Sequence, residues 1–220
     1  MNPSRRRQRL DAALEAAPRP TWGFLSALCC TLLLALGTTA VAQKPAAPIA
    51  IALDPAAVNI HWTLNTTIHT VHGSFKLKSG AFKVDPATGD ASGAIVIDAT
   101  SGESGDFARD KRMHSAVLES PQFPIITFRP THVDGKIDLG APGSVTVSGI
   151  LTLHGQDHPL QIAVSLHPQG SGVALATHFV VPFVAWGLKD PSTFIFRTDK
   201  EVVIDVDLVA TPAPDPPRGR

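Results

Sequence analysis

The feature of this sequence that most constrains its fold is a succession of short segments in which apolar and polar residues alternate. In the first of them, every second residue is apolar: Val58, Ile60, Trp62 and Leu64. A period of two is typical of a β-strand with one buried face. Similar segments follow at about 71–84, 93–100, 124–134, 144–153, 158–167, 173–183 and 201–209. Turn residues such as Asp134-Gly135 separate them, so the pattern predicts an all-β sandwich or barrel.

One passage, residues 103–119, departs from the β pattern. Helical spacing relates four of its residues, Phe107, Asp110, Met113 and His114. Ser104 is expected to cap this helix, with Asp106 in its first turn. The sequence therefore predicts eight strands, with one or two short helices between strands three and four. Eight strands can close a barrel that is either filled by side chains or holds one small ligand, and periodicity leaves that choice open.

The first 42 residues have the features of an export signal. A basic head that includes Arg5 and Arg6 precedes an apolar run from Trp22 to Leu36, and Ala40-Val41-Ala42 matches a signal-peptidase site. We expect cleavage before Gln43, which makes the protein periplasmic or secreted. An uncleaved anchor is the alternative, because the run approaches the length that spans a bilayer. Residues 43–50 are predicted to be a linker, and residues 211–220 a disordered Pro-rich tail.

Removal of residues 1–42 changes the composition of the remaining chain. It leaves 14 basic and 17 acidic residues, a formal charge of −3, and no cysteine. This charge argues against nucleic acid as a partner, because phosphate binding requires clustered Lys and Arg. The absence of cysteine excludes disulfides, thiol nucleophiles and thiolate metal sites.

Neither a catalytic nor a metal-binding motif is evident. No GxSxG or HExxH sequence occurs. His154 and His158 flank a turn beside Asp157, and their convergence would be needed for a His-dependent metalloprotein or enzyme. Asp205 and Asp207 share one face of the last strand, which we interpret as a polar outer stripe. The sequence thus predicts no catalytic residue, no metal ligand and no cofactor.

Three segments resemble the signatures of the YceI-like family of lipocalin-like, polyisoprenoid-binding proteins. The first is HTVHGSF, from His69 to Phe75. The second carries Arg109-Asp110 and then a strand entered through Phe123-Pro124. The third is VSGILTLHGQDHPLQI, from Val147 to Ile162. The matches occur in the family's order and cover roughly residues 51–210.

The resemblance implies an exported eight-stranded antiparallel barrel, over residues 51–210, that encloses an isoprenoid lipid such as a quinone or a polyprenyl chain. It implies a non-catalytic carrier that makes at most transient membrane contact. The oligomeric state is left open, with a homodimer as one option. A solid-barrel, stress-related interaction domain is a further alternative.

The candidate ligand-binding residues follow from that resemblance and from the aromatic composition. After residue 42 the chain has two tryptophans and no tyrosine, so phenylalanine supplies most of its aromatic surface. Phenylalanine suits either a core or a lipid tunnel. The predicted ligand contacts are Trp62, Phe75, Phe107, Arg109, Phe128, Phe179, Phe183, Trp186 and Phe196. Arg109 either steadies a polar headgroup or ties the helix to a strand.

Overall fold

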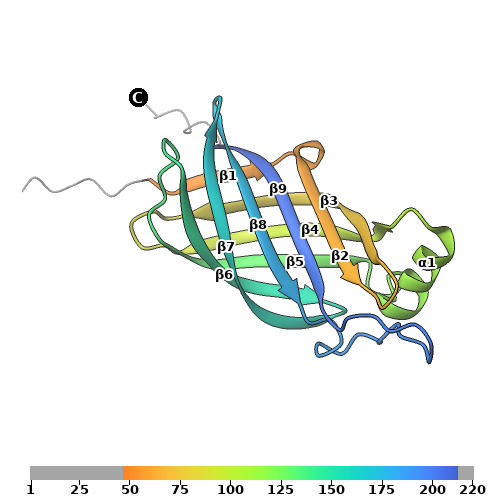
Figure 1. Ribbon diagram of the computed structural model, residues 1–220. Coiled ribbons are helices and arrows are strands. Elements are labelled where there is room, and N and C mark those ends of the chain that lie inside the picture. Colours follow the sequence, from red (N-terminus) through yellow and green to blue (C-terminus); the bar gives the residue numbers. More distant parts are fainter. Residues whose placement is uncertain (1–46, 213–220) are drawn as a thin grey trace, which may run out of the picture. The chain divides into compact units, whose positions relative to one another are not determined.

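The computed structural model describes residues 47–212, which form an antiparallel β-barrel (Figure 1). The expected signal peptide, residues 43–46 of the expected linker and residues 213–220 of the expected tail lie outside these residues. The strands are β1 (Ile49–Leu53), β2 (Val58–Asn65), β3 (Thr70–Val84), β4 (Ala91–Glu103), β5 (Ile125–Asp134), β6 (Gly143–Leu153), β7 (Gln156–Gln169), β8 (Gly172–Val181) and β9 (Val202–Pro212).

Eight strands close the barrel, as predicted. Each of β2 to β9 pairs with its neighbour in the chain, and β9 returns to pair with β2. The closure leaves no long free edge between these strands. Register shifts between Ser74 and Lys76 and between Pro130 and His132 bend the strands, as bulges do in closed sheets.

The ninth strand, β1, is an addition that the sequence analysis did not predict. It pairs with the far end of β3 and with the end of β9, so it continues the position of β2 along the barrel wall. A 3-10 turn, Pro55–Ala57, separates the two strands, and the Asp54 carboxylate caps it by accepting the Ala56 N–H at 3.0 Å. Pro55 has no N–H to donate to a neighbouring strand, which accounts for the interruption between β1 and β2.

Both predicted boundaries of the barrel are therefore corrected. The predicted linker 43–50 is too long by two residues, because β1 begins at Ile49. The tail 211–220 was drawn to begin too early, because Thr211 and Pro212 still pair with β1. The alternation in β1 was hidden, since alanines at positions 50 and 52 occupy the places where polar residues usually mark an outer face.

The predicted helical passage lies between β4 and β5, the third and fourth of the predicted strands. It consists of α1 (Phe107–Arg112), which continues directly into a single π-helical turn, Met113–Val117. Asp106 rather than Ser104 caps α1, since its carboxylate accepts the Arg109 N–H at 2.9 Å. Within residues 47–212, no helix has the length and apolar character needed to cross a bilayer.

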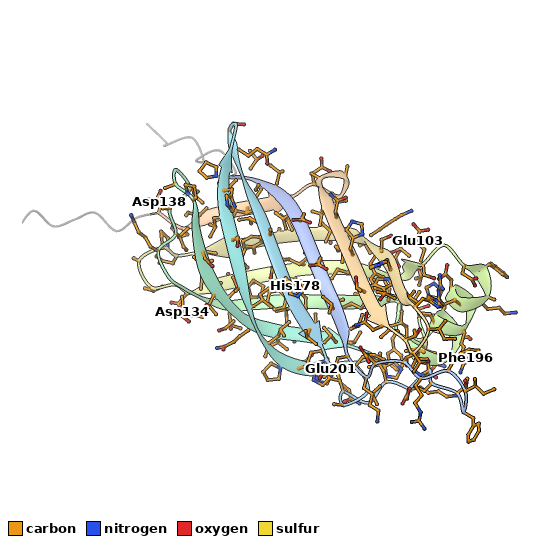
Figure 2. The ribbon with its side chains drawn as sticks, viewed as in Figure 1. Glu103, Asp134, Asp138, His178, Phe196 and Glu201 are labelled. Atoms are coloured by element: carbon orange, nitrogen blue, oxygen red, sulfur yellow. The ribbon has the colours of Figure 1, made fainter. Side chains whose placement is uncertain are left out.

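The two faces of β9 show how the barrel wall is organised. Residues Ile204, Val206 and Leu208 face the interior. Asp205 lies on the outside, where its carboxylate is 2.7 Å from Nδ1 of His178. Figure 2 labels His178 on the barrel wall. The alternation therefore separates an apolar interior from a polar exterior, as the sequence predicts for this strand.

Candidate functional site

The interior of the barrel is hollow. The larger cavity, about 500 Å³, lies at the end that carries α1, and a second cavity of about 180 Å³ extends toward β1 and the opposite end. Four apolar residues line both cavities and form their boundary: Ile60, Ile97, Leu151 and Phe179. Protein interiors ordinarily contain few voids larger than a water molecule. A hollow of this size is therefore not a filled core, and it is the candidate ligand site of the barrel.

The walls of both cavities are almost entirely apolar because the inner positions of the strands carry aliphatic and phenylalanine side chains. The smaller cavity is lined by residues such as Ile51, Phe82, Phe128 and Val145. The larger one adds Val71, Phe75, Phe183 and Val202. Such a surface suits an apolar molecule, because it has few polar groups that would lose their hydration when the molecule binds.

Three segments form the mouth of the larger cavity: α1, the β2–β3 turn and the long loop between β8 and β9 (Figure 1). The Arg112 guanidinium donates to the Pro191 carbonyl oxygen at 3.0 Å, which joins α1 to the loop. The Thr67 N–H donates to the Arg197 carbonyl oxygen, also at 3.0 Å, which joins the turn to the loop. Phe196 lies at this end, opposite Asp134 and Asp138 (Figure 2), and is both half exposed and part of the cavity lining.

The larger cavity has few polar groups in its wall, and one of them lies deep. Trp62 is only 5% exposed, and its Nε1 has no acceptor among the described residues. A buried indole N–H usually has a hydrogen-bond partner. Trp62 therefore lines the cavity with its ring, while its N–H is buried in the wall without a partner among the described residues.

Most of the predicted ligand-binding residues meet in this interior. The larger cavity is lined by Trp62, Phe75, Arg109, Phe179, Phe183 and Phe196. Phe128 lines the smaller cavity, together with Phe179.

Two predicted residues line neither cavity. Phe107 is the first residue of α1 and is 84% exposed. Trp186 lies in the turn that follows β8, where its ring stacks on His158 with centroids 4.1 Å apart and planes 4° apart. Neither residue lies on a strand, so strand alternation gave no direction for either side chain, and the helical spacing that includes Phe107 did not show that this first residue of α1 is exposed.

The aliphatic part of the site was not among the residues predicted from the sequence. Ile97, Leu151 and Ile204 line the larger cavity. The choice of aromatic residues alone left them out, although the alternation in β9 already placed Ile204 on the inner face.

The predicted Arg109-Asp110 pair has a structural role at the start of the helix. The Arg109 side chain donates to the hydroxyl and the carbonyl oxygen of Ser104, at 2.6 and 2.9 Å. The Asp110 carboxylate accepts the Ser104 N–H at 2.9 Å. Both residues therefore anchor the start of the helix to the end of β4. Because Arg109 also lines the cavity, it can contact a bound headgroup as well.

The histidines near the β6–β7 turn do not form a metal site with Asp157. Nε2 of His154 is 2.7 Å from Oε2 of Glu119, while His158 stacks on Trp186. A hydrogen bond from the Thr152 hydroxyl, supported by the charge of Arg129, holds the pKa of Asp157 below its ordinary value. Across residues 47–212, no three His, Cys, Asp or Glu side chains converge as metal ligands.

Curated proteins are similar in sequence to part of this chain. A UPF0312 protein of Vibrio cholerae serotype O1 is 34% identical over 137 residues, which cover 59% of this chain and 70% of that protein. A UPF0312 protein of Vibrio parahaemolyticus serotype O3:K6 is 34% identical over 94 residues, 42% of this chain and 48% of that protein.

Solved structures share the fold. BcnA of Burkholderia cenocepacia aligns over 72% of this chain and 99% of its own, with a TM-score of 0.61 and 22% identity. A polyisoprenoid-binding domain from Saccharophagus degradans, implicated in plant cell wall breakdown, aligns over 75% of this chain and 99% of its own, with a TM-score of 0.56 and 16% identity. The family description "YceI-like domain" matches residues 52–210, which span nearly the whole barrel, so the chain belongs to the YceI-like family.

Proposed function

We propose that this protein is an exported carrier that holds an isoprenoid lipid, such as a quinone or a polyprenyl chain, inside its barrel and catalyses no reaction. The observation that carries the proposal is the apolar interior, with a cavity of about 500 Å³ that adjoins a second of about 180 Å³. The polyisoprenoid-binding domain from Saccharophagus degradans, which shares the fold, supports the same ligand class.

The two cavities suit a ligand with a long tail. The larger one falls in the range of about 300–1,000 Å³ that is typical of small-molecule sites. A tail that passes the boundary at Ile60 and Leu151 would enter the smaller cavity and reach Phe128. Tail length should therefore govern affinity in this proposal.

Burial of the tail would supply most of the binding free energy. At about 25 cal/mol per Å², several hundred Å² of buried tail contribute on the order of 10 kcal/mol. Immobilisation of the lipid and loss of its freedom offset part of this gain. The site needs no covalent step and no ionisable group at its centre.

The polar end of the ligand would lie toward the mouth. Arg109 and Arg112 contribute to the wall there. A guanidinium hydrogen-bonds well to a phosphate or carbonyl oxygen.

A titration with quinones that differ only in tail length tests the proposal. Trp62 lies in the cavity wall, so a bound quinone should quench its fluorescence saturably, with the long-tailed quinone binding more tightly. Equal midpoints for long and short tails would refute the isoprenoid ligand. Mass spectrometry of an organic extract of the native protein would then identify the lipid itself.

Two matched substitutions localise the ligand. Phe128→Asp should weaken binding of the long-tailed quinone, because it places a charge beside the tail in an apolar cavity. Phe107→Asp makes the same change at an exposed position outside both cavities and should leave the titration unchanged. Circular dichroism checks that both variants are folded, and metal analysis of tag-free protein tests the metalloprotein alternative.

A further inference from the structure

Exposed apolar side chains gather at one end of the barrel. Seven large apolar residues are exposed in the described part of the chain, and five of them belong to the segments that form the mouth: Ile68, Phe107, Phe194, Ile195 and Phe196. The other two, Val180 and Val209, lie on strands. Single exposed apolar residues need no explanation, but a group of them around an opening marks an interaction site.

The long loop projects the most exposed pair. Phe194 is 98% exposed and Ile195 is 75% exposed. The Thr193 N–H donates to the Phe196 carbonyl oxygen at 2.7 Å, and the Phe196 N–H donates to the Thr193 hydroxyl at 3.0 Å. These bonds close a tight turn with Phe194 and Ile195 at its apex. The turn is therefore a formed structural element that directs two apolar side chains into the solvent.

The apolar apex is continuous with the cavity. Phe196 adjoins the apex in the chain, is 52% exposed, and lines the larger cavity. Hydrogen bonds from Thr67 and Arg112 hold the β2–β3 turn and α1 against the same loop. An apolar path thus leads from the exposed tip past Phe196 into the interior of the barrel.

The charges near the apex are favourable for a lipid surface. Arg197 is the single charged residue between positions 191 and 198, and it is exposed. Lys111 and Arg112 are exposed on α1. Of the nearby acids, Asp190 accepts the Ser192 N–H, Asp110 is bonded to Ser104, and Asp106 accepts the Arg109 N–H. Asp199 is exposed next to the exposed Lys200. Apolar side chains beside cations are the pattern of a segment that lies in a bilayer interface.

We propose that the mouth of the barrel docks on a lipid bilayer, with Phe194 and Ile195 inserted into its interface and the cavity opening against the membrane. This proposal rests on the proposed function, since it supplies the route by which a membrane lipid enters. It also explains why the exposed apolar residues surround the opening. A bilayer at this place can pass a lipid into the cavity, whereas a protein partner would cover the cavity mouth.

Insertion is tested at the apex itself, in the full chain. The Phe194→Trp variant is mixed with vesicles of phosphatidylethanolamine and phosphatidylglycerol whose acyl chains are brominated, and the signal of the wild-type chain is subtracted. The new tryptophan should shift to the blue and be quenched. Ser171→Trp, in the exposed β7–β8 turn at the opposite end, is the matched control and should show neither effect.

Two results would overturn the docking proposal. One is a signal from the Phe194→Trp variant that behaves like the signal of the control. The other is a blue shift without vesicles that grows with protein concentration, which would assign the tip to contact between two copies of the chain.

A second experiment separates docking from ligand binding. The double variant Phe194→Ser, Ile195→Ser should slow quinone transfer from vesicles by about tenfold or more, since two apolar side chains no longer enter the interface. Its affinity for the same quinone dispersed in detergent should equal that of the wild type, because neither residue lines the cavity. Transfer at the wild-type rate would refute docking through the tip. Failure of the wild type to bind quinone in detergent would instead refute the proposed function, and the vesicle measurement on the Phe194→Trp variant would still report on insertion.

Discussion

At the scale of single residues, two glycines make room for large rings in the interior. A Cβ at Gly73 would lie 2.2 Å from Cζ2 of Trp62 and 2.2 Å from the Glu103 carbonyl oxygen. A Cβ at Gly149 would lie 2.6 Å from Cζ of Phe128. Gly73 is the direct cross-strand partner of Trp62, so the indole lies against bare backbone. The position of this ring in the cavity wall thus depends on the absence of a methyl group at Gly73.

We therefore expect Gly73→Ala to displace Trp62. Overpacking of this kind typically lowers the free energy of unfolding by about 1–3 kcal/mol, and the contact with a backbone oxygen leaves little freedom to relax. Urea unfolding measures the loss, and the emission of Trp62 should change with it. Gly143→Ala is the control on β6, where an added Cβ meets nothing within 4 Å. An alanine at position 73 that is as stable as the alanine at position 143 would contradict the packing described here.

At the scale of elements, the mouth depends on short segments held by side-chain caps. The π-helical turn is fastened to β4 through His114, whose Nε2 is 2.8 Å from the Gly102 carbonyl oxygen and whose Nδ1 is 2.8 Å from the Ser120 hydroxyl. Ser120 is the one polar residue among the buried residues of the described chain. Since α1 has six residues, propensity alone cannot hold it, and these contacts must do so.

The cap of α1 gives the first prediction for an element. Asp106→Ala removes the acceptor of the Arg109 N–H and should cost about 1 kcal/mol of stability. Hydrogen exchange should rise in residues 107–117 and remain unchanged in the strands. Asp106→Asn keeps an acceptor at the same place and should retain most of the protection. Equal exchange in the two variants would show that the cap contributes nothing.

The long loop gives a prediction about pH. The hydroxyl and the N–H of Ser192 both hydrogen-bond to Asp190 and hold the pKa of its carboxyl below the ordinary value. A lowered folded-state pKa means that the carboxylate stabilises this turn above the unfolded pKa, and that the contribution disappears as the pH falls through the folded pKa. The amide proton shift of Ser192, followed by NMR, should titrate below about pH 3.9. In Asp190→Asn this titration should vanish, and its persistence would assign it to another group.

At the scale of the whole molecule, closure of the eight-stranded barrel creates the enclosed interior on which the proposed function depends. The β9–β2 pairing joins the last of the eight barrel strands to the first, so the apolar faces of all eight strands point into one interior. With side chains of this size they do not fill it, and a hollow remains. The same closure makes α1 and the long loop the rim of one opening. Lipid uptake, in our proposal, is therefore a property of one end of the barrel.

Export gives the prediction for the complete chain. The pattern Ala40-Val41-Ala42 after an apolar run predicts that the protein isolated from its native host begins at Gln43 and is released in soluble form. N-terminal sequencing decides the point. An intact Met1 terminus in the membrane fraction would show that the protein is an anchored barrel and not a released carrier.

What the sequence by itself determined was the set of elements and their nature. Alternation and turn residues are local properties, and they placed eight strands and the helical passage near their observed positions. β1 was not predicted, because the alanines at positions 50 and 52 do not give the alternation of apolar and polar residues. Its pairing with β3 exists only in the closed barrel. A local pattern cannot report a partner that lies some thirty residues away along the chain.

Only the tertiary structure decided which of the candidate residues form a site. Phe128 and Phe179 lie on strands, and register and closure turned them into the interior. Phe107 and Trp186 are of the same chemical kind, but they lie on a helix start and a turn, and tertiary packing directed one to the solvent and the other onto His158. Composition also could not distinguish a filled barrel from a hollow one. That difference depends on how far the side chains of eight strands reach across the ring, which is a property of the assembled barrel.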